Sequence, residues 1–113
     1  MGALYYDKIL GFESTLMRNI GKEIENFVST YLQEQGLKLI TANFSCKLGE
    51  IDLIMWDRDV LVFVEVRYRK NADYGDGIAT ISKSKQYKIT RTALCYLQEQ
   101  NLSNKVLCRF DIV

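Results

Sequence analysis

The sequence contains no histidine and no proline, and only three of its 113 residues are cysteines. Without histidine, neither a Ser-His-Asp triad nor a Cys-His pair can form. A zinc site is also disfavoured, because its usual nitrogen ligands are missing. Acid–base or metal chemistry must therefore rest on carboxylates, lysines or tyrosines, and carboxylate ligands favour Mg²⁺ or Mn²⁺.

Long apolar runs are absent as well. No stretch reaches the roughly 18 apolar residues of a membrane span, so we expect no membrane association. Residues 1–10 lack the basic start, apolar middle and cleavage site of a secretory signal. The cysteines, Cys46, Cys95 and Cys108, are widely spaced and predict buried or inert thiols in a reducing compartment. We therefore expect a single cytoplasmic domain covering residues 1–113.

Charge is unevenly distributed, although the net charge is only +1. Residues 67–91 are rich in bases and contain only two acids, Asp73 and Asp76. The bases are Arg67, Arg69, Lys70, Lys83, Lys85, Lys88 and Arg91. A local basic stripe favours a nucleic acid held against one face. The alternative is a solvated helix face, and charge does not separate the two.

An amphipathic helix is predicted in the N-terminal third of the chain. Its apolar residues recur at helical spacing: Ile24, Phe27, Val28, Tyr31 and Leu32. We expect this helix to begin between Glu13 and Gly21. It should end at Gly36, because glycine is the usual residue just past a helix C-terminus.

Four short strands and a second helix are predicted to follow. The strands are expected over residues 37–43, 51–56, 60–68 and 106–112. In the first strand, Leu37, Leu39 and Ile40 are the candidates to point inward. The second helix should begin at a Ser82 or Ser84 cap and end near residue 100, after a glycine-containing loop over residues 69–80. This αβββαβ order predicts a three-layer α/β domain with a mixed central sheet.

Two acids interrupt the apolar strands, Asp52 in the second and Glu65 in the third. Burying a carboxylate without a partner is costly, so each needs a compensating group. A hairpin that pairs Asp57 with Val60 places Asp52 directly opposite Glu65, with their Cβ atoms roughly 5 Å apart. A divalent cation between them would turn repulsion into coordination. The alternative is that each acid pairs with a base, such as Arg67.

Further polar residues could approach the same end of the sheet. Glu50 shares a strand face with Asp52, and Arg67 shares one with Glu65. Glu25 lies on the flank of the first helix, and Gln86 lies at the start of the second, in line with its inner side. Each of these signals is weak by itself.

Several motifs together resemble the bacterial YraN-like family of uncharacterised endonuclease-like proteins. They are GKEIE (21–25), YLQEQG (31–36), GEIDLI (49–54), VFVEVRYR (62–69), SKQ (84–86) and RFDIV (109–113). Residues 1–20 lie outside the resemblance. This family is similar to the PD-(D/E)xK nuclease superfamily, which includes restriction endonucleases and archaeal Holliday-junction resolvases. The resemblance implies a restriction-endonuclease-like αβββαβ fold and phosphodiester cleavage dependent on Mg²⁺ or Mn²⁺.

The resemblance also implies roles for individual residues. Asp52 and Glu65 would be metal ligands, and Glu25 would support the metal or its water. Gln86 would reach toward the site and the nucleic-acid backbone. The superfamily's motif lysine is Arg67 here, and the family's glycine before the helix glutamate is Ile24. Arginine stays protonated and cannot act as a base, but it can stabilise the charge on a reacting phosphate.

Two hypotheses follow. The first is a metal-dependent nuclease acting on structured or branched DNA, with the basic residues from Arg67 to Arg91 holding phosphates and Tyr74 and Tyr87 stacking on bases. The second is a non-catalytic nucleic-acid-binding module with a degenerate nuclease fold, favoured by Arg67. Resolvase-like relatives act as dimers, so a homodimer is one option.

Overall fold

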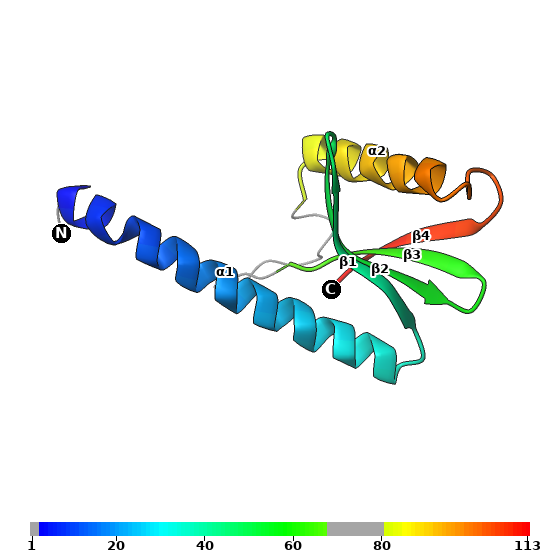
Figure 1. The fold of residues 1–113 in the computed structure, drawn as a ribbon, viewed down its shortest axis with the longest axis horizontal. Helices are drawn as coiled ribbons and strands as arrows, with labels where there is room; N and C mark the ends of the chain where they lie inside the picture. The colour runs from blue at the N-terminus through cyan, green and yellow to red at the C-terminus, as the bar shows by residue number, and fades with distance from the viewer. Residues whose placement is uncertain (1–2, 68–80) are drawn as a thin grey trace.

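The computed structural model describes the backbone of residues 3–67 and 81–113, and within these ranges the side chains from residue 19 onward. The elements are α1 (Ala3–Glu34), β1 (Lys38–Cys46), β2 (Gly49–Asp57), β3 (Val60–Glu65), α2 (Lys83–Glu99) and β4 (Leu107–Ile112) (Figure 1). The predicted αβββαβ order is confirmed. The predicted loop over residues 69–80 lies outside the described residues.

The sheet is mixed, as predicted. Its strand order is β1-β2-β3-β4. The first three strands form an antiparallel meander, whereas β4 lies parallel to β3. Two parallel neighbours need a crossover connection, and α2 belongs to it. The two helices lie on opposite sides of the sheet, consistent with a three-layer α/β arrangement (Figure 1).

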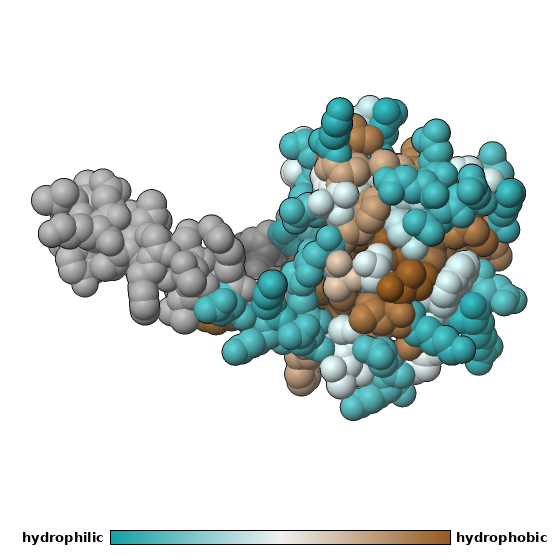
Figure 2. Space-filling view, viewed as in Figure 1, coloured by the Kyte–Doolittle hydropathy of each residue, from teal (hydrophilic) through white to brown (hydrophobic). Residues whose placement is uncertain are grey.

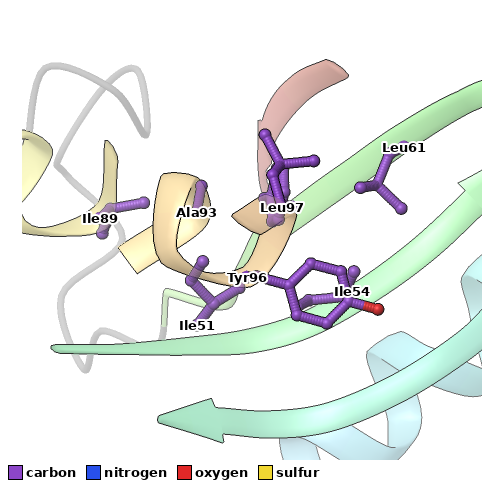
Figure 3. Close-up of a cluster of buried hydrophobic side chains, with 8 residues drawn as sticks. Ile51, Ile54, Leu61, Ile89, Ala93, Tyr96 and Leu97 are labelled. Carbon is purple, nitrogen blue, oxygen red and sulfur yellow. The ribbon is translucent and has the colours of Figure 1, made fainter. Parts of the chain in front are cut away.

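Two separate hydrophobic clusters explain why β3 is apolar on both faces. Leu61 and Phe63 belong to the cluster under α2, while Val62 and Val64 belong to the cluster under α1. All four are at most 1% exposed. Figure 3 shows Leu61 and residues of β2 facing the buried side chains of α2. Because each fully buried side chain contributes about 1.5–3 kcal/mol, these clusters fix the helices against the sheet.

The predicted end of α1 is confirmed, but its predicted start is wrong. Gly36 has a positive φ of 102°. The Leu37 N–H bonds back to the Leu32 carbonyl at 3.1 Å, which satisfies the end of the helix. The helix begins at Ala3 rather than between Glu13 and Gly21. No proline interrupts the chain, so nothing prevents the helix from starting earlier.

The edge strand β1 differs from the prediction. It runs to Cys46 rather than ending near residue 43, and Lys47 and Leu48 form the turn that follows. Leu37 is buried, but Leu39 and Ile40 are 40% and 38% exposed, not inward. A register shift between Leu39 and Thr41 turns this part of the strand away from the clusters. Figure 2 shows apolar surface exposed between the two helices.

The second helix follows the prediction closely. Ser82, not Ser84, is its N-cap, and the Ser82 hydroxyl accepts a hydrogen bond from the Lys85 N–H at 3.1 Å. Its inner face includes Ile89, Ala93 and Leu97, which recur every four residues and are buried. Among the described helices, none combines the length and apolar character needed to cross a membrane.

Candidate active site

The predicted register between β2 and β3 is confirmed. Asp57 pairs with Val60, and the pairing continues without interruption to Leu53 opposite Val64. The next position outward is Asp52 on β2 and Glu65 on β3. The hairpin turn therefore sets the two acids opposite each other at the end of the strand pair.

Asp52 is held by the backbone of the neighbouring strand. Its Oδ2 atom accepts a hydrogen bond from the Val66 N–H at 2.7 Å. A bond from a backbone N–H to an ionised carboxylate is short and about twice as strong as a neutral one. This bond fixes the carboxylate just past the end of β3, beside Glu65.

Glu65 is buried and carries an unfavourable charge. The residue is 9% exposed. Burial raises the pKa of Glu65 above its ordinary value of 4.5, and the charge of Asp52 and a hydrogen bond with it raise the pKa further. Lys85 opposes this effect, because its Nζ atom lies 3.2 Å from Glu65 Oε2. The alternative that each acid pairs with a base is therefore correct for Glu65, and Lys85 is a base that pairs with it.

Glu25 approaches the same carboxylates from α1. Burial raises the pKa of Glu25, followed by the charge of Asp52, while a hydrogen bond with Asn43 opposes the shift. The charge of the exposed Glu50 also raises this pKa. Asp52 therefore acts electrostatically on both Glu25 and Glu65, although the two glutamates come from distant parts of the sequence.

A cavity of about 260 Å³ joins these groups. It is lined by three acids and two bases, with small or apolar residues between them. They are Glu25, Asp52, Glu65, Arg67 and Lys85, with Gly21, Ile24 and Val66. One water occupies about 30 Å³ of liquid, so a hydrated cation or a phosphate group fits here.

The described residues contain no compact group of three acid, cysteine or histidine side chains able to enclose a metal ion. Mg²⁺, however, is usually bound through one or two carboxylates, with waters and substrate phosphates completing its shell. Asp52 and Glu65 fit a site of that kind, because they come from neighbouring positions on two paired strands and line the same cavity. Glu25, the predicted third ligand, borders the same space.

The structure does not bring Gln86 into the cavity. Gln86 is exposed, and its Nε2 atom donates a hydrogen bond to the Ile81 carbonyl at 2.9 Å. Lys85 takes the inner position instead. It precedes the buried Ile89 by one helical turn, and residues separated by four positions share a helix face.

The other predicted basic residues that the structure describes divide into two groups. Arg67 lines the cavity, and Lys83, Lys88 and Arg91 are exposed on α2. Arg69, Lys70 and Tyr74 lie outside the described residues. The guanidinium of Arg91 lies 5.8 Å from the centre of the Tyr87 ring, so this tyrosine already has a cationic neighbour.

Sequence analysis missed two contributors. Lys85 was predicted only as a phosphate contact, although its spacing from Ile89 indicated an inner face. Asn43 was predicted as an ordinary strand residue, yet it has a φ of 56° and hydrogen-bonds Glu25. Asparagine tolerates this left-handed backbone better than most residues, and its presence is the only local sign of the unusual conformation at position 43.

Comparison with known proteins identifies the family. The model of the uncharacterised protein family UPF0102 matches residues 24–113. A UPF0102 protein from Coxiella burnetii is 50% identical over 88% of this chain and 82% of its own length. Another from Psychromonas ingrahamii is 58% identical over 74% of this chain and 67% of its own. A third, from Pseudomonas syringae pv. tomato, is 43% identical over 82% and 73%. This chain therefore belongs to the uncharacterised protein family UPF0102.

Proposed function

We propose that this protein is a nuclease that uses Mg²⁺ or Mn²⁺ to hydrolyse phosphodiester bonds in structured or branched DNA. The observation that carries the proposal is the β2–β3 pairing up to Leu53 and Val64, which places Asp52 and Glu65 at the next position, in a cavity also lined by Arg67 and Lys85. The two carboxylates can hold a metal ion, and the positively charged Arg67 and Lys85 beside them can hold a phosphate. Such hydrolysis requires both kinds of group.

The fold class supports the same proposal. The αβββαβ order with a mixed sheet agrees with a restriction-endonuclease-like fold. In this arrangement the two acids come from adjacent strands, while the helices bring one charged residue each to the cavity, Glu25 from α1 and Lys85 from α2.

Each side chain has a distinct task in the proposed reaction. The cation, held by Asp52 and Glu65, would supply Lewis-acid polarisation of a phosphate oxygen. The Val66 N–H keeps Asp52 oriented while the substrate binds. Arg67 has a fixed positive charge and stabilises the charge that develops on the phosphate.

Lys85 has two roles that depend on the state of the site. In the structure its ammonium group partly neutralises Glu65. Its side chain is 48% exposed, so it has freedom to swing from the carboxylate to a bound phosphate. Among the described residues lining the cavity, Lys85 carries the ammonium group, whose N–H donors are able to orient an attacking water.

A non-catalytic nucleic-acid-binding module is the second candidate. The ion pair between Lys85 and Glu65 favours it, because an ammonium group already occupies one face of a proposed ligand. In that case, the basic surface of α2 would still bind phosphates, but no cleavage would accompany binding.

Cleavage assays with matched variants test the proposal. Purified protein is incubated with linear, single-stranded and branched DNA and with structured RNA, with Mn²⁺ or with EDTA. We expect cleavage of branched DNA that needs Mn²⁺ and disappears in Asp52→Asn and Glu65→Gln. Asp59→Asn, an exposed acid in the β2–β3 turn, is the control that should keep full activity.

Three outcomes would contradict the proposal. Activity that survives EDTA and both substitutions would come from a contaminating nuclease. Binding without cleavage would support the non-catalytic module. Cleavage of RNA in preference to every DNA would refute the proposed substrate class.

A further inference from the structure

A second cavity lies at the opposite end of the sheet from the acids. Its volume is about 690 Å³, larger than that of the carboxylate cavity. Trp56 of β2 lines it, four residues along the strand from Asp52, so the two sites are about 13 Å apart at roughly 3.3 Å per residue. The proposed nuclease chemistry makes no use of this second cavity.

Three cations from separate segments converge on it. Lys38 comes from the start of β1, Arg58 from the β2–β3 turn and Lys105 from the segment before β4. Within the described part of the chain, no acid lies at ion-pair distance from any of them. Asp59 is the acid among the lining residues, so the cavity has an excess of positive charge.

The neighbouring acid Asp57 does not cancel this charge. Its Oδ2 atom accepts a hydrogen bond from Arg109 Nη1 at 2.7 Å, and Arg109 Nε also bonds Asp111 at 3.1 Å. Asp57 is thus engaged by a fourth base, Arg109, which it shares with Asp111. An anion that enters the cavity meets a net attraction.

Arg58 occupies a strained backbone position. Its φ is 56°, in the left-handed region that disfavours residues with a bulky side chain. Glycine or asparagine would satisfy the same turn with less strain. Strain of this kind is typical of residues retained for what their side chain binds.

Trp56 adds an aromatic surface beside the cations. One part of Trp56 packs against the cluster under α2, and the residue remains partly exposed. Lys38 is its direct cross-strand partner, so the two side chains share one face. The exposed Leu107 adds an apolar rim. A ring next to three cations that have no ion pair among the described residues matches a nucleotide, which has a stacking base and a phosphate.

We propose that this cavity binds a nucleotide unit, with its phosphate held by Lys38, Arg58 and Lys105 and its base packed against Trp56. The unit is either a free nucleotide or part of a nucleic-acid strand, and both present the same chemistry. The inference goes beyond the nuclease activity and does not rest on it.

Tryptophan fluorescence tests the proposal directly, because Trp56 is the only tryptophan in the sequence. Full-length protein is titrated, without divalent cation and at low salt, with inorganic phosphate, thymidine monophosphate and oligothymidylate. We expect a saturable change in emission. Tighter binding of oligothymidylate identifies a strand as the ligand, while equal affinities identify a free nucleotide. Calorimetry in parallel detects binding that leaves the fluorescence unchanged.

Variants separate this cavity from other basic surface. Arg58→Asn, and Lys38→Ala combined with Lys105→Ala, should each weaken nucleotide binding by about tenfold or more, the effect of losing a charge-assisted bond. Lys47→Ala removes an exposed lysine from the β1–β2 turn and should leave binding unchanged. Asp52→Asn should also bind normally, even if the nuclease proposal fails.

Several results would overturn the inference. These are the absence of saturable binding for every probe, equal weakening by Lys47→Ala, and retention of affinity in both cavity variants. Binding of inorganic phosphate as tight as that of thymidine monophosphate would refute the base contact with Trp56.

Discussion

Replacing Asp52 with asparagine should stabilise the folded protein at neutral pH. Asparagine keeps an oxygen that can accept the Val66 N–H but removes a negative charge facing Glu65. The structure shows no ion pair of Asp52 within the described residues that the substitution would break. The dominant effect is therefore the loss of repulsion between like charges.

The magnitude follows from Coulomb's law. Two unit charges about 5 Å apart repel by about 3 kcal/mol at an effective dielectric constant near 20. Partial exposure of Asp52 and screening by Lys85 reduce this value. Replacing a charge-assisted hydrogen bond by a neutral one costs about 1 kcal/mol. We expect a net gain of about 1–2 kcal/mol, or roughly 5 °C in the melting temperature.

The predicted gain in stability should depend on pH, and the raised pKa of Glu65 sets the direction of that dependence. Because the pKa of Glu65 is raised in the folded state, the folded protein binds this proton more tightly than the unfolded chain does. Stability from this group is therefore present near pH 4.5 and below, and is lost as the pH rises through the folded pKa. The gain in stability from Asp52→Asn should appear at pH values above the folded-state pKa of Glu65 and vanish at pH values well below it.

Urea denaturation of the wild type and variant at neutral and acidic pH measures the effect. Asp59→Asn is the control, since an exposed acid without an ion pair in the described structure should change stability by less than about 0.5 kcal/mol. A variant no more stable than the wild type at neutral pH would refute the reasoning. So would an equal gain at both pH values.

Two further predictions concern packing and thiol reactivity. A Cβ atom on Gly49 would lie 2.9 Å from Thr92 Oγ1, so Gly49→Ala should destabilise the fold by about 1–3 kcal/mol in the same assay. A Cβ atom on Gly21 would have nothing within 4 Å, so Gly21→Ala should stabilise α1 by about 0.5–1 kcal/mol. A Gly49→Ala variant more stable than Gly21→Ala would contradict the contacts seen at the two glycines. Iodoacetamide at neutral pH should modify Cys46 before Cys95, as followed by peptide mass spectrometry. The Leu48 N–H lowers the pKa of Cys46, whereas hydrogen bonds, first to Glu99, raise the pKa of Cys95 to about 11. Faster labelling of Cys95 would contradict this.

The sequence predicted the strand register because the controlling information is local. Two apolar runs flank the short turn at Arg58 and Asp59, and the length of a hairpin turn fixes which residues of the two strands pair. The opposition of Asp52 and Glu65 follows from this constraint. Glu25 of α1 and Arg67, two residues beyond Glu65, also line the predicted site.

The errors arose where tertiary packing overrides pattern. Leu39 and Ile40 look like inward strand residues, but β1 is an edge strand with a local register shift, which no apolar pattern encodes. Lys85 and Gln86 are adjacent at the start of α2, and the docked helix brings Lys85 to Glu65 while Gln86 bonds the Ile81 carbonyl. The early start of α1 had no cap signal in its first turn.

Titration calorimetry with Mn²⁺ is the most direct test of the claim that Asp52 and Glu65 hold a divalent cation. The wild type should bind Mn²⁺ at neutral pH, and binding should weaken as the pH falls, because the raised pKa of Glu65 lets protons compete. Asp52→Asn should abolish the binding heat, while Asp59→Asn should keep it. No binding heat in the wild type, or an unchanged heat in Asp52→Asn, would contradict the account.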